Sequence, residues 1–268
     1  MTNEAAAAVL RAIDLPTFVP VLARVGGVVT FFPLLGAETI PVKFRLFLAA
    51  ALAWLMRPFV PAAVAAIDPS AGAGVFAARI AQELLVGAAL GFSAQVAMAG
   101  FEAAGQFVGF QMGLTLSGVV DPINGEQVSA LSVFYRLVAT VLYFSLNAHH
   151  VFLVAVRDSY EWVAPGAAVP AAGFAALATR ISSSLFLLGL RIAAPALVIS
   201  LVLDVALLLA ARALPQVNLL ILGYPVKLAL GFLGVAAGLV VLPRLASDSL
   251  LTALDQARSL AGALGVAP

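Results

Sequence analysis

Residues 105–127 read GQFVGFQMGLTLSGVVDPINGEQ, and the two halves of this stretch favour different structures. The first half carries a glycine at every fourth position from 105 to 113, between apolar side chains. Glycines at this spacing flatten one helix face and let a second backbone approach closely, as in paired membrane helices. The second half holds turn-forming dipeptides, Asp-Pro at 121–122 and Asn-Gly at 124–125. The stretch therefore predicts a tightly packed apolar helix that ends in an irregular segment.

The composition of the whole chain is that of an all-α membrane protein. Of 268 residues, 63% are hydrophobic and 10% are charged, and the mean hydropathy is +1.10. Soluble domains carry about 25% charged residues and could not bury this much apolar surface. Apolar runs of roughly 20 residues match the bilayer and predict about six long helices in hairpins. They lie at 16–35, 44–62, 77–112, 128–156, 182–211 and 217–242. Because only short loops separate them, we expect a single domain over 1–268.

Several functional classes find no support in the sequence. The start of the chain lacks the basic lead and unbroken apolar core of a cleavable signal peptide, so we expect it to be retained. Without cysteine there is no disulfide, thiolate metal site or cysteine nucleophile, and the net charge of +1 gives no footprint for nucleic acid. His149 and His150 are adjacent rather than at metal-ligand spacing, and no nucleotide-binding loop is present. We therefore predict no enzyme, no metal and no cofactor.

Ionisable side chains lie inside the apolar runs. They are Arg24, Glu83, Glu102, Arg136, Arg191, Asp204 and Lys227. At a bilayer centre each would cost roughly 2.5–3.5 kcal/mol on insertion scales unless paired or hydrated. Snorkelling from helix ends accounts for Glu83, Arg136 and Lys227, and less well for Arg24, Arg191 and Asp204. We favour structural pairing over a transport role, because pairing satisfies the same physics without a substrate.

The two charges flanking Pro215 are candidates for a pair. Asp204 precedes this proline by eleven residues and Lys227 follows it by twelve, so they reach similar depth in a helical hairpin. Arg191 lies thirteen residues before Asp204, on a nearly opposite helix face. We therefore expect Arg191 to find its partner elsewhere, in another subunit.

Small residues recur at helix-packing spacing in other runs. Gly87 and Gly91 are four apart, as are Gly105 and Gly109, and all four are candidates for close helix contacts. Chance glycines in loosely packed helices remain the alternative for any one pair, and this alternative is weaker for the triple ending at Gly113.

Five pieces, in order, carry a family resemblance. They are PLLGAETIPVKFRLFLAAALA at 33–53, QELLVGAALGF at 82–92, GFQMGLTLSGVVDP at 109–122, LNAHHVFLVAVRDSY at 146–160 and ALPQVNLLILGYPVKLALG at 213–231. Along nearly its whole length the chain resembles the flagellar type III export-gate subunit FliR and its injectisome counterparts, the flagellar branch more closely. It departs at Ala148 and Leu208, where that family usually has glycine. The second departure suggests altered packing between the last two helices.

The resemblance implies a core subunit of an export gate in the bacterial inner membrane, within the flagellar basal body. FliP-type and FliQ-type partners would complete a funnel-shaped hetero-oligomer through which unfolded flagellar proteins leave. The N-terminal part would be FliP-like and the C-terminal hairpin, about 182–247, FliQ-like. An FlhB-type switch protein would be a separate chain. Charges inside such an assembly could pair across subunits or face a wet lumen rather than lipid.

The resemblance also implies that 109–125 supplies a loop that plugs the export path. The residues concerned are Phe110, Met112, Gly113, Leu114, Leu116, Gly118, Val119, Val120, Asp121 and Pro122. The local sequence agrees, because Gly113 and Gly118 should loosen the helix and apolar side chains between breakers can close a pore by dewetting. A plain connector is the alternative reading of this segment.

Two other functional classes stay open at this point. A six-helix secondary transporter or permease would also have Gly- and Pro-interrupted helices and midplane charges. A purely structural scaffold would tolerate loss of the central loop. A transporter should be stable alone, whereas a gate subunit should need its partners.

Overall fold

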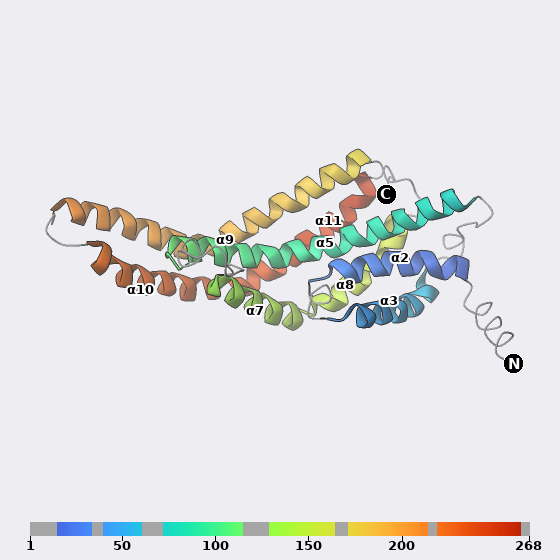
Figure 1. The fold of residues 1–268 in the computed structure, drawn as a ribbon, viewed down its shortest axis with the longest axis horizontal. Helices are drawn as coiled ribbons and strands as arrows, with labels where there is room; N and C mark the ends of the chain where they lie inside the picture. The colour runs from blue at the N-terminus through green and yellow to red at the C-terminus, as the bar shows by residue number, and fades with distance from the viewer. Residues whose placement is uncertain are drawn as a thin grey trace. The chain divides into compact units, whose positions relative to one another are not determined.

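The computed structural model describes residues 15–33, 40–60, 72–114, 129–163, 171–213 and 219–263. Within these ranges the chain is helical and forms no strand, which confirms the all-α class (Figure 1). The helices in order are α2 (Leu15–Phe31), α3 (Val42–Met56), the short 3-10 helix η1 (Arg57–Phe59), α5 (Ala73–Gln111), α7 (Ala130–Ser145), α8 (Ala148–Trp162), α9 (Ala171–Ala213), α10 (Leu219–Leu239) and α11 (Leu242–Ala263).

The described helices offer fewer membrane spans than the six predicted. Only α5 and residues 178–213 of α9 are long and apolar enough to cross a bilayer singly. The broken pairs α7 with α8 and α10 with α11 raise the total to four at most. The 17 residues of α2 and the 15 of α3 rise about 25 and 22 Å, less than a hydrocarbon core of about 30 Å.

Local sequence explains where these helices begin and end. The hydroxyl of Ser129 caps α7 by accepting a hydrogen bond from the Leu131 N–H at 3.3 Å. The expected run 128–156 is interrupted at Asn147, whose φ of 53° is left-handed and ends the regular helix. Asparagine is among the few non-glycine residues that visit this region readily.

The end of α5 is defined by a Schellman motif. Gly113 has a φ of 77°, its N–H donates to the Phe110 carbonyl at 3.0 Å, and the Leu114 N–H donates to the Gly109 carbonyl at 2.9 Å. These are the two hydrogen bonds with which such motifs close the last turn of a helix. Gly113 therefore terminates α5, and the helix ends at Gln111, within one residue of the expected end of the apolar run at residue 112.

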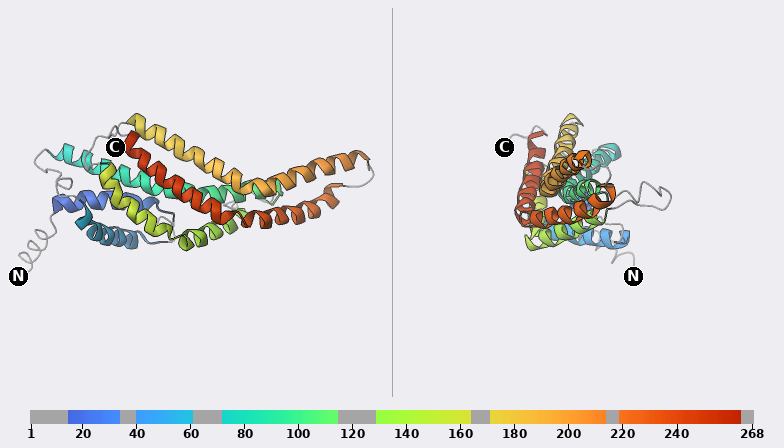
Figure 2. Two further views of the ribbon diagram at one scale, coloured as in Figure 1. Left: turned by 180° about the vertical axis from the view of Figure 1, so that it is seen from behind. Right: turned by 90° about the vertical axis from the view of Figure 1, so that its left-hand side faces the viewer.

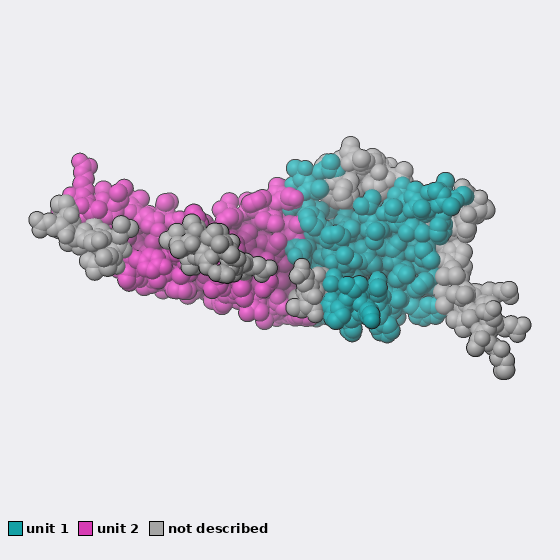
Figure 3. Space-filling model, viewed as in Figure 1, with its two compact units in different colours: residues 1–95, 147–181, 252–268 teal, residues 96–146, 182–251 magenta. Residues whose placement is uncertain are grey.

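The chain divides into two compact units, coloured separately in Figure 3. Unit 1 comprises residues 1–95, 147–181 and 252–268, and unit 2 comprises 96–146 and 182–251. Helices α5, α9 and α11 contribute to both units, so each unit combines segments that are distant in sequence.

In unit 1, α2 packs against α3 and the first part of α5. Ala49 and Ala53 are the buried positions of α3, and Phe18 meets Trp54 edge to face with ring centroids 6.2 Å apart. Phe32, just after α2, makes a similar contact with Phe152 of α8 at 5.4 Å. The N-terminal helices and α8 thus share one apolar core.

In unit 2, the second part of α9 and α10 run side by side in opposite directions (Figures 1 and 2). Small residues set their spacing, because a Cβ on Gly234 would lie 2.7 Å from the Ala196 Cα. The second part of α5 meets α7 as closely, since a Cβ on Gly105 would lie 2.5 Å from the Ser132 nitrogen. These contacts hold α9 against α10 and α5 against α7.

Candidate functional site

The first charged cluster surrounds Arg24, which is completely buried in α2. Its Nε donates to Glu83 Oε2 of α5 at 2.7 Å, and its two terminal nitrogens donate to the backbone carbonyls of Ser159 and Val163 at 2.9 and 3.0 Å. The guanidinium also stacks on the Tyr160 ring, 4.1 Å from its centroid. Both sides of the ion pair are buried, so Glu83 neutralises a charge that water cannot reach.

Arg24 also acts as a tertiary cap for α8. Ser159 lies in the last turn of that helix and Val163 is its C-cap, where carbonyl groups lack helical partners. A cation at this end interacts favourably with the helix dipole as well. The snorkelling expected for Glu83 is therefore wrong, because the fold brings α2 and α5 together and seals the pair between them.

Close backbone contact explains how Arg24 reaches Glu83. A Cβ on Gly27 would lie 2.5 Å from the Leu84 carbonyl oxygen, and one on Gly91 would lie 2.6 Å from that of Val28. A Cβ on Gly87 would overlap the Arg24 carbonyl oxygen. Three glycines thus let α2 and α5 cross with their backbones in contact. The spacing of Gly87 and Gly91 indicated a close contact, but nothing in the sequence identified α2 as the partner.

The second cluster lies in unit 2 and centres on Asp204 of α9. Lys227 Nζ of α10 donates to Asp204 Oδ1 at 2.7 Å and to Oδ2 at 3.0 Å. Gln111 Nε2, in the last turn of α5, donates to Asp204 Oδ2 at 2.8 Å. The Asp204 and Lys227 side chains, 37% and 21% exposed, do interact, as their equal depth in the hairpin predicts. The sequence did not identify Gln111 as part of this cluster, because the prediction rested on charged residues and Gln111 is uncharged.

Two predicted buried charges are not buried in this chain. The Glu102 side chain is 40% exposed and lies 3.9 Å from that of Arg136, which is 52% exposed. Arg191 is exposed and has no ion-pair partner in the described part of the chain. Its neighbours Ile192 and Ala193 form the buried stripe of α9, so Arg191 points away from the packed side of its own helix.

The candidate plug segment is only partly described. Phe110 is 73% exposed, Met112 is completely buried, and Gly113 and Leu114 are half-buried at the end of α5. Gly109 is buried one turn earlier. The remaining predicted plug residues, Leu116, Gly118, Val119, Val120, Asp121 and Pro122, lie outside the described residues.

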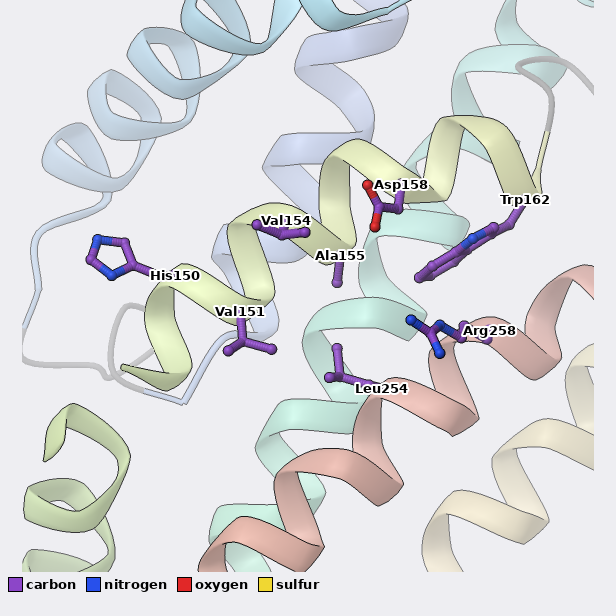
Figure 4. Close-up of a pocket in the computed structure, with 8 residues that line it drawn as sticks. All are labelled: His150, Val151, Val154, Ala155, Asp158, Trp162, Leu254 and Arg258. Carbon is purple, nitrogen blue, oxygen red and sulfur yellow. The ribbon is translucent and has the colours of Figure 1, made fainter. Parts of the chain in front are cut away.

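A shallow groove of about 260 Å³ lies between α8 and α11 in unit 1 (Figure 4). Its lining residues are His150, Val151, Val154, Ala155, Asp158, Trp162, Leu254 and Arg258. Figure 4 shows Ala155 of α8 and Leu254 of α11 pointing toward each other. The Arg258 guanidinium stacks at 5.7 Å from the Trp162 ring centroid. Among the described residues, no group of three or more His, Cys, Asp or Glu side chains could hold a metal ion.

Long apolar helices, backbone contacts at glycine and ion pairs within apolar segments define an all-helical membrane protein. Residues 15–253 match the family described as "Bacterial export proteins, family 1", and the chain belongs to this family.

Curated relatives match over most of both chains. The flagellar biosynthetic protein FliR of Bacillus subtilis (strain 168) is 29% identical over 259 residues, covering 95% of this chain and 98% of the relative. The protein of the same name from Escherichia coli (strain K12) is 31% identical over 218 residues, with 81% of each chain covered. That of Caulobacter vibrioides is 31% identical over 211 residues, covering 79% of this chain and 83% of the relative.

Proposed function

We propose that the chain is a core membrane subunit of the flagellar type III export gate. The observation that carries this proposal is the family match over 15–253, together with relatives named flagellar biosynthetic proteins that align over most of their own length. In this role the chain forms, with FliP-type and FliQ-type subunits, a channel for unfolded flagellar proteins across the bacterial inner membrane. An FlhB-type switch protein is a further partner in this proposal.

Within this assembly we assign a FliP-like role to the N-terminal part and a FliQ-like role to the hairpin at about 182–247. The hairpin assignment is supported by the antiparallel contact of α9 with α10 in unit 2. The funnel and its place in the basal body belong to the same proposal.

An exposed apolar face on α9 supports an assembly with other membrane chains. Only 22% of the most apolar window of α9 is buried in this chain, against 67% for α5. The exposed side chains on α9 are Phe186, Leu187, Leu190, Val198, Leu201, Val202, Val205, Leu208 and Leu209. Lipid could cover these residues, but Arg191 lies among them, and a guanidinium is costly in hydrocarbon unless paired or hydrated. A partner subunit can supply both apolar contacts and an acidic group.

Copurification tests the assembly. The chain produced alone should aggregate or be degraded, whereas production with its partners should yield one stable complex that elutes as a single peak. A monodisperse, stable monomer in detergent would contradict the gate role and would favour a secondary transporter, which functions without such partners.

We further propose that 109–125 supplies a plug for the export path. Deleting Leu116 to Asn124 should leave the complex assembled, because the close helix contacts at Gly87, Gly91 and Gly105 lie outside the deletion. It should let small ions leak through the membrane, because the apolar constriction is lost. Val119→Asp should leak as well, and Ser117→Ala should not. Conductance is compared at matched complex levels, and an assembled deletion that stays tight would make the segment a simple connector.

A further inference from the structure

The Asp204 carboxylate has more partners than its charge requires. Lys227 Nζ contacts both carboxylate oxygens, at 2.7 and 3.0 Å, and balances the charge by itself. The Gln111 amide adds a hydrogen bond of 2.8 Å but no charge. What this third group contributes is position, because it ties the last turn of α5 to the hairpin of α9 and α10.

A second contact joins the same turn of α5 to α10. Met112 is completely buried, and a Cβ on Gly231 would lie 2.8 Å from the Cγ, Sδ and Cε atoms of Met112. Glycine at 231 therefore leaves the space that the methionine fills. Gly231 and Lys227 are four residues apart and share one face of α10, so the polar and apolar contacts with α5 lie side by side.

The last turn of helix α5 closes immediately after Gln111 and Met112. Gly113, at a φ of 77°, and the hydrogen bond from Leu114 N–H to the Gly109 carbonyl complete the Schellman motif. Phe110, in the same turn, is 73% exposed in this chain. The end of α5 is thus held at consecutive residues by two different kinds of contact.

We infer that Gln111, Asp204 and Gly231 are positioning residues of the gate. They fix the C-terminal end of α5 on the hairpin, and so fix the point from which the chain leaves Leu114 toward the proposed plug. The inference rests on the proposed function for its consequence in export, but the attachment itself stands on described contacts alone. It gives the ion pair within the hairpin a role beyond charge neutralisation.

Changes at Gln111 separate the two roles of Asp204. Gln111→Leu removes the amide but leaves both hydrogen bonds from Lys227 to Asp204, so neutralisation is intact. Gln111→Asn keeps the polarity and is one methylene too short to maintain the contact, which provides a second variant if the first assembles poorly. Gln106→Leu is the matched control, because Gln106 is half-buried on the same helix and forms no hydrogen bond with the described part of the chain.

The chain lacks cysteine, so Phe110→Cys accepts a single nitroxide label at an exposed site beside the contacts. In the assembled complex, electron paramagnetic resonance should show a mobile label population that rises about tenfold with Gln111→Leu, the order expected for losing a hydrogen bond to a charged group. Gly231→Ala should raise the mobility too, because its methyl displaces Met112, whereas Gln106→Leu should leave the spectrum unchanged.

Ion leak is then measured in the same variants without the cysteine. Mobility and leak rising together support both the positioning role and the plug. Raised mobility in a membrane that stays tight supports the positioning role and contradicts the plug. A spectrum unchanged by Gln111→Leu, Gln111→Asn and Gly231→Ala overturns the inference, whatever the leak, and leaves Asp204 and Lys227 as a neutralising pair.

Discussion

Arg24 shows how a single residue can serve charge balance and helix capping at once. Losing one partner of a buried ion pair strands the other charge, and such changes cost roughly 3–5 kcal/mol. We therefore expect Glu83→Leu to destabilise the protein by about that amount, because Arg24 would remain at 0% exposure with no carboxylate beside it. Chemical unfolding of the complex in detergent, followed by tryptophan fluorescence at Trp54 and Trp162, measures the change.

The paired variant refines this expectation. Arg24→Leu with Glu83→Leu removes both charges and should be less destabilising than the sum of the two single changes. It should not restore full stability, since the carbonyl groups of Ser159 and Val163 lose their cap. Arg157→Leu is the control, because Arg157 pairs with Asp158 at an exposed site, where such pairs contribute about 0–1 kcal/mol. Equal effects at Arg157 and Glu83 would contradict the buried-pair account.

The buried pair of Arg24 with Glu83 and the hairpin pair of Asp204 with Lys227 also differ in how far the sequence alone could predict them. Asp204 and Lys227 flank one turn, so counting residues to Pro215 gives their depth and their contact. Arg24 and Glu83 are 59 residues apart on helices whose order in space the sequence does not determine. Gln111 carries no charge and could be found only once α5 was placed beside α9.

At the scale of helices, adjacent glycines in α2 give a sharp test of the contact with α5. A Cβ on Gly27 would meet the Leu84 carbonyl oxygen at 2.5 Å and the Ala88 nitrogen at 2.7 Å, whereas a Cβ on Gly26 has nothing within 4 Å. Gly27→Ala must push the helices apart, and overpacking of this kind costs typically about 1–3 kcal/mol. Gly26→Ala should be neutral or stabilising, because alanine is the better helix former by about 1 kcal/mol.

The measurement is the midpoint of thermal unfolding for both variants in the same complex. A similar fall in the unfolding midpoint for Gly27→Ala and Gly26→Ala would contradict the close contact between α2 and α5. It would indicate that these positions need glycine for its flexibility instead.

The spacing of Gly87 and Gly91 predicted the surface on α5 but not its partner helix. The break at Asn147 was missed because a lone asparagine is a weak signal beside the usual Gly and Pro breakers.

At the scale of the whole molecule, composition predicted a membrane protein but could not show which faces the chain buries by itself. The sequence of α9 is apolar on nearly every side of the helix, so it does not distinguish a buried face from an exposed one. The structure makes the distinction, because Ile192, Ala193 and Ala196 form the buried stripe. In the described part of the chain, at most four spans are found where six were expected, because hydropathy does not register breaks or short helices. What remains exposed and apolar is the surface available to other subunits.

Substitutions at Arg191 can test whether a partner covers this surface, because lipid and a partner subunit would accommodate a charged residue differently. A carboxylate on a partner helix would form an ion pair with Arg191, whereas lipid tails offer the guanidinium no favourable interaction. We expect Arg191→Glu to reduce the partner recovered per copy of this chain by about tenfold or more, equivalent to about 1.4 kcal/mol. Arg191→Lys should retain most of the assembly, because it keeps the positive charge at this position of α9. Quantitative copurification at matched expression gives the ratio, and an acidic-to-basic change in a partner helix should restore assembly to Arg191→Glu. Full partner recovery with Arg191→Glu would show that this face of α9 meets lipid or water instead.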